Sequence, residues 1–198
     1  MTEKPILCNA QTVRNFLEGR QTQDRRPIKP PIPSSATRAL KSKLSSEWKF
    51  FSEPIPTVAH AVTDWIESPY FPGDHIYVRE TWADLRPYNG IAYKADISRG
   101  IVTKWSPSIH MPKWAARLWL EVTGVRVERV QDISEEDCLK EGIDVDGDAY
   151  QEGEMMVSAG SHVAPERYAF ITLWNQLYPD SWHFNDWVFV YDLKKLDR

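Results

Sequence analysis

The chain has 198 residues, of which 42% are hydrophobic and 26% charged, and its formal net charge is −4. This length suffices for one domain of ordinary size, and the composition is typical of a soluble globular protein. The net acidity excludes a cationic surface over the whole molecule, so a nucleic-acid site would have to be a local basic patch.

Charge is distributed unevenly along the chain. Residues 14–43 contain eight basic and two acidic side chains, whereas residues 132–154 contain ten acidic side chains and one basic one. The nine tryptophans can serve a core, the stacking of bases, or both. Cys8 and Cys138 lie far apart without a CxxC spacing, so we expect neither a zinc site nor a disulfide, and no cofactor.

The sequence predicts no association with a membrane. It contains no run of about 18 apolar residues, the minimum for a spanning helix. Residues 1–10 are too short and too polar for a signal peptide. We therefore expect a cytoplasmic location.

The first part of the chain predicts a strand, a helix and an extended segment. Residues 4–8 are predicted as a strand, and Asn9 can cap the helix that follows and ends at Gly19. Residues 20–26 form a polar extended segment, and residues 27–35 form a proline-rich connector.

Residues 36–70 combine two helical patches, 37–48 and 57–65, with few strand signals. We interpret residues 31–70 as a helical insertion over the main domain, either as a lid or as a solvated excursion without a role.

Strand patterns dominate the middle of the chain and cover residues 75–82, 91–95 and 117–130. The second of these follows an Asn89–Gly90 turn. The third is either a strand pair or one bent strand, with Gly124 as a bulge. Residues 105–114 contain two prolines and predict irregular structure.

The last third predicts helices and a closing strand. Ser134 caps a short helix that ends at Gly142, and residues 143–163 predict a mobile acidic loop. Residues 165–177 form an amphipathic helix, and residues 187–193 alternate as a strand.

This order of elements predicts a single α+β domain that covers residues 1–198. Strands fill the middle and helices lie at the ends. We expect a curved sheet or a small β-barrel, flanked by short helices.

Four segments carry a resemblance to a known family: residues 17–30 (LEGRQTQDRRPIKP), 72–83 (PGDHIYVRETWA), 105–117 (WSPSIHMPKWAAR) and 125–142. Together they resemble the ASCH-domain family of the PUA-like superfamily, in the form found in phages and prophages. They span most of the chain outside residues 31–70 and 143–163. The resemblance implies a small β-barrel with a cleft that admits RNA or a nucleotide, in the cytoplasm of a bacterial host.

Some ASCH proteins are amidohydrolases that act on 4-acetylcytidine, and others are reported to cleave RNA. The lysine, threonine and glutamate of those amidohydrolases correspond here to Gln21, Asp24 and Glu141. Gln21 cannot exchange a proton near neutral pH, and Asp24 has no hydroxyl nucleophile. Thr22 shares a face with Asp24 in an extended segment and offers a shifted nucleophile–base pair. The resemblance therefore favours binding over catalysis.

Two glutamates need an explanation. Glu141 lies in the last turn of its helix, where a negative charge costs about 0.3–1 kcal/mol, so it is either partnered or exposed beside Lys140. Glu80 shares a strand face with apolar residues and needs a partner, which Arg25, Arg26 or Arg117 could supply. It either orients a base edge in a cleft or forms a buried ion pair that fixes strand register.

Several residues are candidates for contact with nucleic acid. Guanidinium groups form paired bonds with phosphate oxygens, and a tryptophan beside a lysine and a histidine suits base stacking, although it equally suits a core. The candidates are Arg20, Arg25, Arg26, Arg79, Glu80, Trp82, His110, Lys113, Trp114 and Arg117.

Three functions remain open. The first is binding of RNA, a modified nucleoside or single-stranded nucleic acid without catalysis. The second is an amidohydrolase or ribonuclease that uses Glu141, Asp24 and Thr22. The third is a protein-interaction factor in phage assembly or host takeover, with residues 31–70 and 143–163 as partner surfaces.

Overall fold

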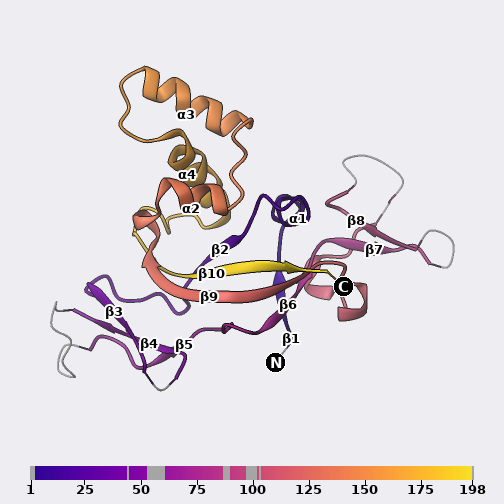
Figure 1. Ribbon diagram of the computed structural model, residues 1–198, viewed down its shortest axis with the longest axis horizontal. Helices are drawn as coiled ribbons and strands as arrows, with labels where there is room; N and C mark the ends of the chain where they lie inside the picture. Colours follow the sequence, from indigo (N-terminus) through magenta and orange to yellow (C-terminus); the bar gives the residue numbers. More distant parts are fainter. Residues whose placement is uncertain are drawn as a thin grey trace.

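A five-stranded sheet organises the molecule (Figure 1). The structure is a computed structural model that describes residues 3–43, 45–52, 61–86, 90–96, 102 and 104–197. In spatial order the strands are β1 (Glu3–Leu7), β6 (His75–Arg79), β9 (Trp119–Arg129), β10 (Trp187–Leu196) and β2 (Gln23–Pro27). β1 runs parallel to β6, and the other neighbours are antiparallel.

β9 and β10 pair along nearly their whole length, so residues 117–130 contain one bent strand and not a pair. The pairing skips one residue of β9, because Asp192 lies opposite Gly124 while Leu193 lies opposite Val122. A Cβ atom at position 124 would lie 2.5 Å from Asp192 Oδ2, which a larger residue could not accept without displacement. The predicted bulge at Gly124 is confirmed.

Within the described ranges, the α-helices are α1 (Ala10–Leu17), α2 (Glu135–Lys140), α3 (Asp148–Ser158) and α4 (Pro165–Leu177), and a 3₁₀ turn, η4 (Val130–Asp132), precedes α2. Asn9 Oδ1 caps α1 by accepting from Thr12 N at 2.9 Å, and Ser134 Oγ caps α2 by accepting from Asp137 N at 3.1 Å. Gly142 ends α2 with a φ of +83°, in the left-handed region that favours glycine. The predicted caps are confirmed.

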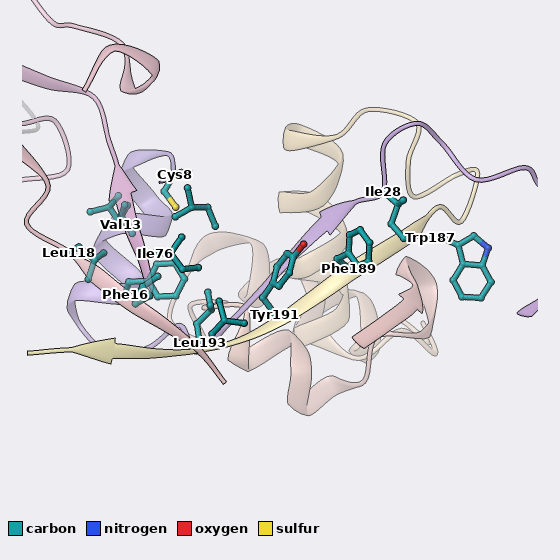
Figure 2. Packing of buried hydrophobic residues seen from close by; sticks show 14 of the residues in the cluster. Cys8, Val13, Phe16, Ile28, Ile76, Leu118, Trp187, Phe189, Tyr191 and Leu193 are labelled. Carbon is teal, nitrogen blue, oxygen red and sulfur yellow. The ribbon is translucent and has the colours of Figure 1, made fainter. Parts of the chain in front are cut away.

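β10 is buried on both faces. One face carries Phe189, Tyr191 and Leu193 into the main core, and Figure 2 shows the three in a row along the strand. The other face packs its valines, at positions 188 and 190, against α2 and α4. Burial on both faces explains the uninterrupted apolar run in this strand.

The helical insertion predicted for residues 31–70 is wrong. This region forms a separate sheet of β3 (Arg38–Lys41), β4 (Glu47–Phe51) and β5 (Ile66–Glu67). Phe50 of β4 is completely buried and packs edge-on against Trp187, with 5.2 Å between ring centroids. Strand pairing and this aromatic contact outweigh the local helix propensity. The patch predicted at residues 57–65 lies partly outside the described residues.

The acidic loop predicted for residues 143–163 is also corrected, because α3 occupies its centre. α3 packs against α4, and Gly153 lies at the contact. A Cβ atom at Gly153 would lie 2.8 Å from Cα of Pro165, so the absent side chain permits the close approach. Gly153 and the acidic composition therefore weaken the helical signal in the sequence. The contact with α4 stabilises α3 in the folded protein.

The strand predicted for residues 75–82 is interrupted. β6 ends at Arg79, and β7 (Trp82–Asp84) pairs with β8 (Ile91–Tyr93) in a two-stranded sheet at one side of the molecule (Figure 1). Asn89 of the predicted turn lies outside the described residues.

The irregular segment at residues 105–114 contains two 3₁₀ turns, η2 (Ser108–His110) and η3 (Lys113–Ala115). Met111 and Ala115 are each only 1% exposed, so the turns are anchored to a small core beside β7.

The edge strands β1 and β2 approach each other at one point, where Arg26 Nη2 donates to Leu7 O at 2.9 Å. The described strands nevertheless do not close a barrel, because β1 pairs with β6 and β2 pairs with β10. The predicted α+β class is confirmed, and the sheet is open. Among the described residues, no helix is long and apolar enough to cross a membrane.

Candidate functional site

A cavity of about 550 Å³ lies between the edge strands β1 and β2, and we name it the outer chamber. Its lining combines basic and aromatic side chains: Lys4, Arg26, Lys29, Tyr70, Phe71, Tyr178, Phe189 and Tyr191. The volume falls in the range of about 300–1,000 Å³ that is usual for ligand pockets.

Hydrogen bonds hold the aromatic rings of the outer chamber in place. Tyr191 and Ser68 share a hydrogen bond of 3.2 Å between their hydroxyl oxygens, and the Tyr70 hydroxyl donates to Pro5 O at 2.7 Å. The two tyrosine rings meet edge to face, with 5.2 Å between centroids. Burial raises the pKa of Tyr70 to about 12, so its hydroxyl remains a donor at neutral pH. The rings form a preorganised surface.

Two of the three cations are held by partners. Lys4 Nζ lies 2.8 Å from Asp74 Oδ2 and 4.6 Å from the centroid of the Phe71 ring. Arg26 Nε donates to Asp24 Oδ2 at 2.7 Å. Lys29 is exposed, and it has no ion pair with a carboxylate among the residues that the structure describes.

A smaller cavity of about 150 Å³, the inner chamber, lies between α1, β2, the end of α2 and α4. Arg26 and Tyr178 line both chambers, so the two cavities adjoin at these side chains. An apolar cavity of about 150 Å³ holds a benzene ring, so the inner chamber has room for one six-membered ring.

The three positions that correspond to the hydrolase residues converge on the inner chamber. Gln21, Asp24 and Glu141 all line it, and all three are buried. The Oε1 atom of Gln21 is buried without a hydrogen-bond donor in the described part of the chain. Thr22 is exposed and does not line the chamber, so the shifted pair predicted for Thr22 and Asp24 is not assembled.

Glu141 is buried against an arginine. Its Oε1 accepts from Arg25 Nη1 at 2.7 Å, and its Oε2 accepts from the Arg25 backbone N–H at 3.3 Å. Burial raises the pKa of Glu141 to about 7, against the opposing attraction of Arg25. The prediction of a partner is confirmed, and the exposed alternative beside Lys140 is wrong.

The phosphate-binding role predicted for Arg25 does not fit its environment. Its side chain is 0% exposed and donates to Gln23, to Glu128 at 3.1 Å and to Asp137 at 3.0 Å, besides Glu141. A guanidinium with these partners is not available to a ligand. Arg25 therefore positions Glu141.

Glu80 forms the buried ion pair. It is 1% exposed and accepts two hydrogen bonds from Arg117, at 2.9 Å from Nε and 3.1 Å from Nη2. Arg117 also bonds Asp96 at 2.6 Å. Burial raises the pKa of Glu80, and Arg117 opposes this shift. Neither residue lines a chamber, so the role of a cleft acid is not supported.

The remaining candidates lie outside both chambers. Arg20 pairs with Glu18 at 2.5 Å, on the chain segment after α1. Trp82 is 8% exposed and belongs to the small core beside η3. The last four candidates lie on or beside η2 and η3. Arg79 donates to the carbonyl oxygen of Ile109. His110 lies in η2, and Lys113 and Trp114 lie in η3.

Most residues that line the outer chamber could not be predicted from the sequence. Lys4, Lys29, Tyr70, Phe71, Tyr178 and Tyr191 come from separate segments and form no local motif. Only the alternation in β10 places Phe189 and Tyr191 on one face.

Metal binding has no candidate site in the described ranges, where no three His, Cys, Asp or Glu side chains are grouped suitably. Cys8 and Cys138 are free and buried, and burial raises the pKa of each thiol to about 12. Comparison with known proteins gives no match to a family model, to a curated protein or to a solved structure.

Proposed function

We propose that this protein is an RNA- or modified-nucleobase-binding protein of the ASCH/PUA-like type, of phage or prophage origin, that acts in the cytoplasm of a bacterial host. The observation that carries the proposal is the outer chamber, where three cations and five aromatic rings line one cavity of about 550 Å³.

The cavity offers groups that match the phosphate and the base of a nucleotide. Arg26 and Lys29 suit a phosphate, because both side chains carry a positive charge and N–H donors. The rings of Tyr70 and Tyr178 suit a base, because stacking on aromatic side chains is worth about 1–3 kcal/mol per base. Among the described residues, Glu67 is the one carboxylate in the lining.

Binding is favoured over catalysis because of the inner chamber. The Gln21 amide cannot exchange a proton near neutral pH, and Asp24 supplies no hydroxyl nucleophile. Hydrolysis of an acylated base remains a second candidate, and it is supported by Glu141, whose buried carboxyl has a pKa of about 7.

Fluorescence anisotropy tests the proposal with a labelled single-stranded RNA of about ten nucleotides, at low and at physiological salt. We expect binding that weakens with salt and that Lys29→Gln reduces, whereas Lys194→Gln, which alters an exposed lysine of β10 outside both chambers, does not. Absence of binding to RNA, single-stranded DNA and nucleotides at low salt would overturn the proposal.

The second candidate has its own assay. Purified protein is incubated with 4-acetylcytidine and with labelled RNA, and the products are separated. Turnover that Glu141→Gln abolishes would replace binding by catalysis as the function. Unchanged substrates would exclude hydrolysis of these two compounds.

A further inference from the structure

The indole of Trp114 is exposed although it is firmly held. It is 56% exposed, while Trp82, which meets it edge to face at 5.7 Å between ring centroids, is 8% exposed. The guanidinium of Arg86 lies 4.3 Å from the Trp114 centroid, and the Tyr93 hydroxyl donates to Ala115 O at 2.8 Å. A large apolar ring that is oriented but not covered is typical of a binding surface.

Basic and apolar residues lie close to Trp114 along the chain. Ile109 is 58% exposed, and His110 and Lys113 are exposed on the same pair of turns. We name Ile109, His110, Lys113 and Trp114 the Trp114 platform.

The platform belongs to a positively charged part of the chain. Within residues 75–117, the described side chains include six Arg or Lys and three Asp or Glu. Residues 132–154, with ten acidic side chains and one basic one, lie mainly on α2 and α3. Figure 1 shows these helices near the opposite end of the sheet from β7 and β8. A polyanion at the sheet is therefore attracted toward the platform and repelled by the helices.

A continuous series of contacts links the outer chamber to the platform. Arg26 donates to Leu7 O at the end of β1, and Leu7 lies opposite Arg79 in the β1–β6 pairing. Arg79 donates in turn to the carbonyl oxygen of Ile109. Leu7 is 42% exposed, so the path between the two sites runs over the surface.

We propose that the protein binds a single-stranded polynucleotide at two subsites, with one nucleotide in the outer chamber and another base stacked on Trp114. The inference rests on the proposed function and adds the class of ligand. The strand must be single, because both subsites address unstacked bases and Trp114 offers a ring rather than hydrogen bonds to a base edge.

The test compares two ligands and two aromatic variants. The ligands are a single-stranded RNA of about ten nucleotides and a nucleoside monophosphate. Trp114→Ala removes the platform ring, and Phe184→Ala removes a control ring that is 67% exposed in the turn before β10. We expect Trp114→Ala to weaken RNA binding about tenfold, as the loss of one stacked base predicts, and to leave the monophosphate unchanged. Phe184→Ala should change neither.

Each other outcome has a defined meaning. RNA binding that Trp114→Ala leaves unchanged, or a monophosphate bound as tightly as RNA, would overturn the second subsite and leave the proposed function standing. Absence of binding to either ligand would overturn the proposed function itself. Equal displacement of RNA by a polyglutamate peptide, or dimerisation that Trp114→Ala abolishes, would overturn the inference in favour of a protein partner.

A second variant keeps the test valid if Trp114→Ala does not fold. Lys113→Gln keeps the ring and removes a half-exposed positive charge, which pairs with Glu3 of β1. We expect it to reduce the slope of log affinity against log salt by about 0.7 for RNA and not for the monophosphate. An unchanged slope would contradict a strand that crosses the platform.

Discussion

Arg25 and Arg26 are adjacent in β2, yet they face opposite sides of the sheet. Arg25 lies opposite Val190 of β10, on the face covered by α2 and α4, and its side chain is 0% exposed. Arg26 lies opposite Phe189, on the face that opens to the outer chamber, and its side chain is 29% exposed. The same side chain therefore meets two different environments.

Adjacent residues of one strand can have different roles, because their side chains point to opposite faces of the sheet. A buried guanidinium must be paired, so Arg25 is surrounded by carboxylates and stabilises the inner chamber through Glu141. Arg26 pairs with Asp24 and donates to Leu7 O at the sheet edge, and its side chain stays partly exposed in the outer chamber. Arg25 thus positions Glu141, and we propose that Arg26 contacts the ligand.

The largest expected effect concerns stability. Arg25→Met should lower the free energy of unfolding by about 3–5 kcal/mol, because it leaves the buried Glu141 without its counter-charge. Urea unfolding followed by tryptophan fluorescence measures this loss. The matched variant Arg26→Met should lower the free energy of unfolding distinctly less. Equal losses for the two variants would contradict the difference between the two arginines.

The second effect is a pH dependence of stability that comes from Glu141. Its folded-state pKa is about 7, above the ordinary value of 4.5, so the folded protein holds a proton that the unfolded chain releases first. Stability from this group is fully present below pH 4.5 and falls as pH rises toward 7. The total loss is up to about 3 kcal/mol, since one pKa unit corresponds to about 1.4 kcal/mol.

Unfolding free energies at pH 5 and pH 8 measure this dependence. In Glu141→Gln the group cannot titrate, so the variant should lose less stability than the wild type over the same interval. Parallel pH profiles for the two proteins would show that Glu141 is charged at both pH values.

The third effect concerns binding. Arg26→Gln should weaken RNA binding roughly ten- to a hundredfold, because a hydrogen bond to a charged group contributes about 1.5–3 kcal/mol. Anisotropy titration measures the change. The double variant Arg26→Gln/Asp24→Asn removes the carboxylate left unpaired, so it should regain stability without regaining affinity. Recovery of both would mean that Arg26 acts only through the fold.

The smallest effect is expected at Lys29. Lys29→Gln should weaken RNA binding about two- to fourfold near physiological salt and reduce the salt slope by about 0.7, as the loss of one phosphate contact predicts. Lys194→Gln should leave both quantities unchanged. If Lys29→Gln weakened RNA binding more than Arg26→Gln, the phosphate would lie closer to Lys29 than to Arg26.

The sequence by itself determined the elements whose signals are local. Caps at Asn9 and Ser134, the bulge at Gly124 and the helix at residues 165–177 all appear as expected. The two caps have their cause within a few residues, in a side chain that accepts a backbone N–H, whereas Gly124 also meets Asp192 of the paired strand. The buried carboxylate at Glu80 follows the same logic, because alternation alone placed it on an apolar face.

Tertiary packing determines the features that the sequence leaves open. The sequence marks both Arg25 and Arg26 as basic, and only the packing of α2 and α4 behind β10 buries the first. Residues 38–51 became strands because they pair with each other and pack Phe50 on Trp187. The outer chamber unites segments that are distant in sequence, so no local pattern contains it. Burial depends on what covers a face, and that is known only when the chain is folded.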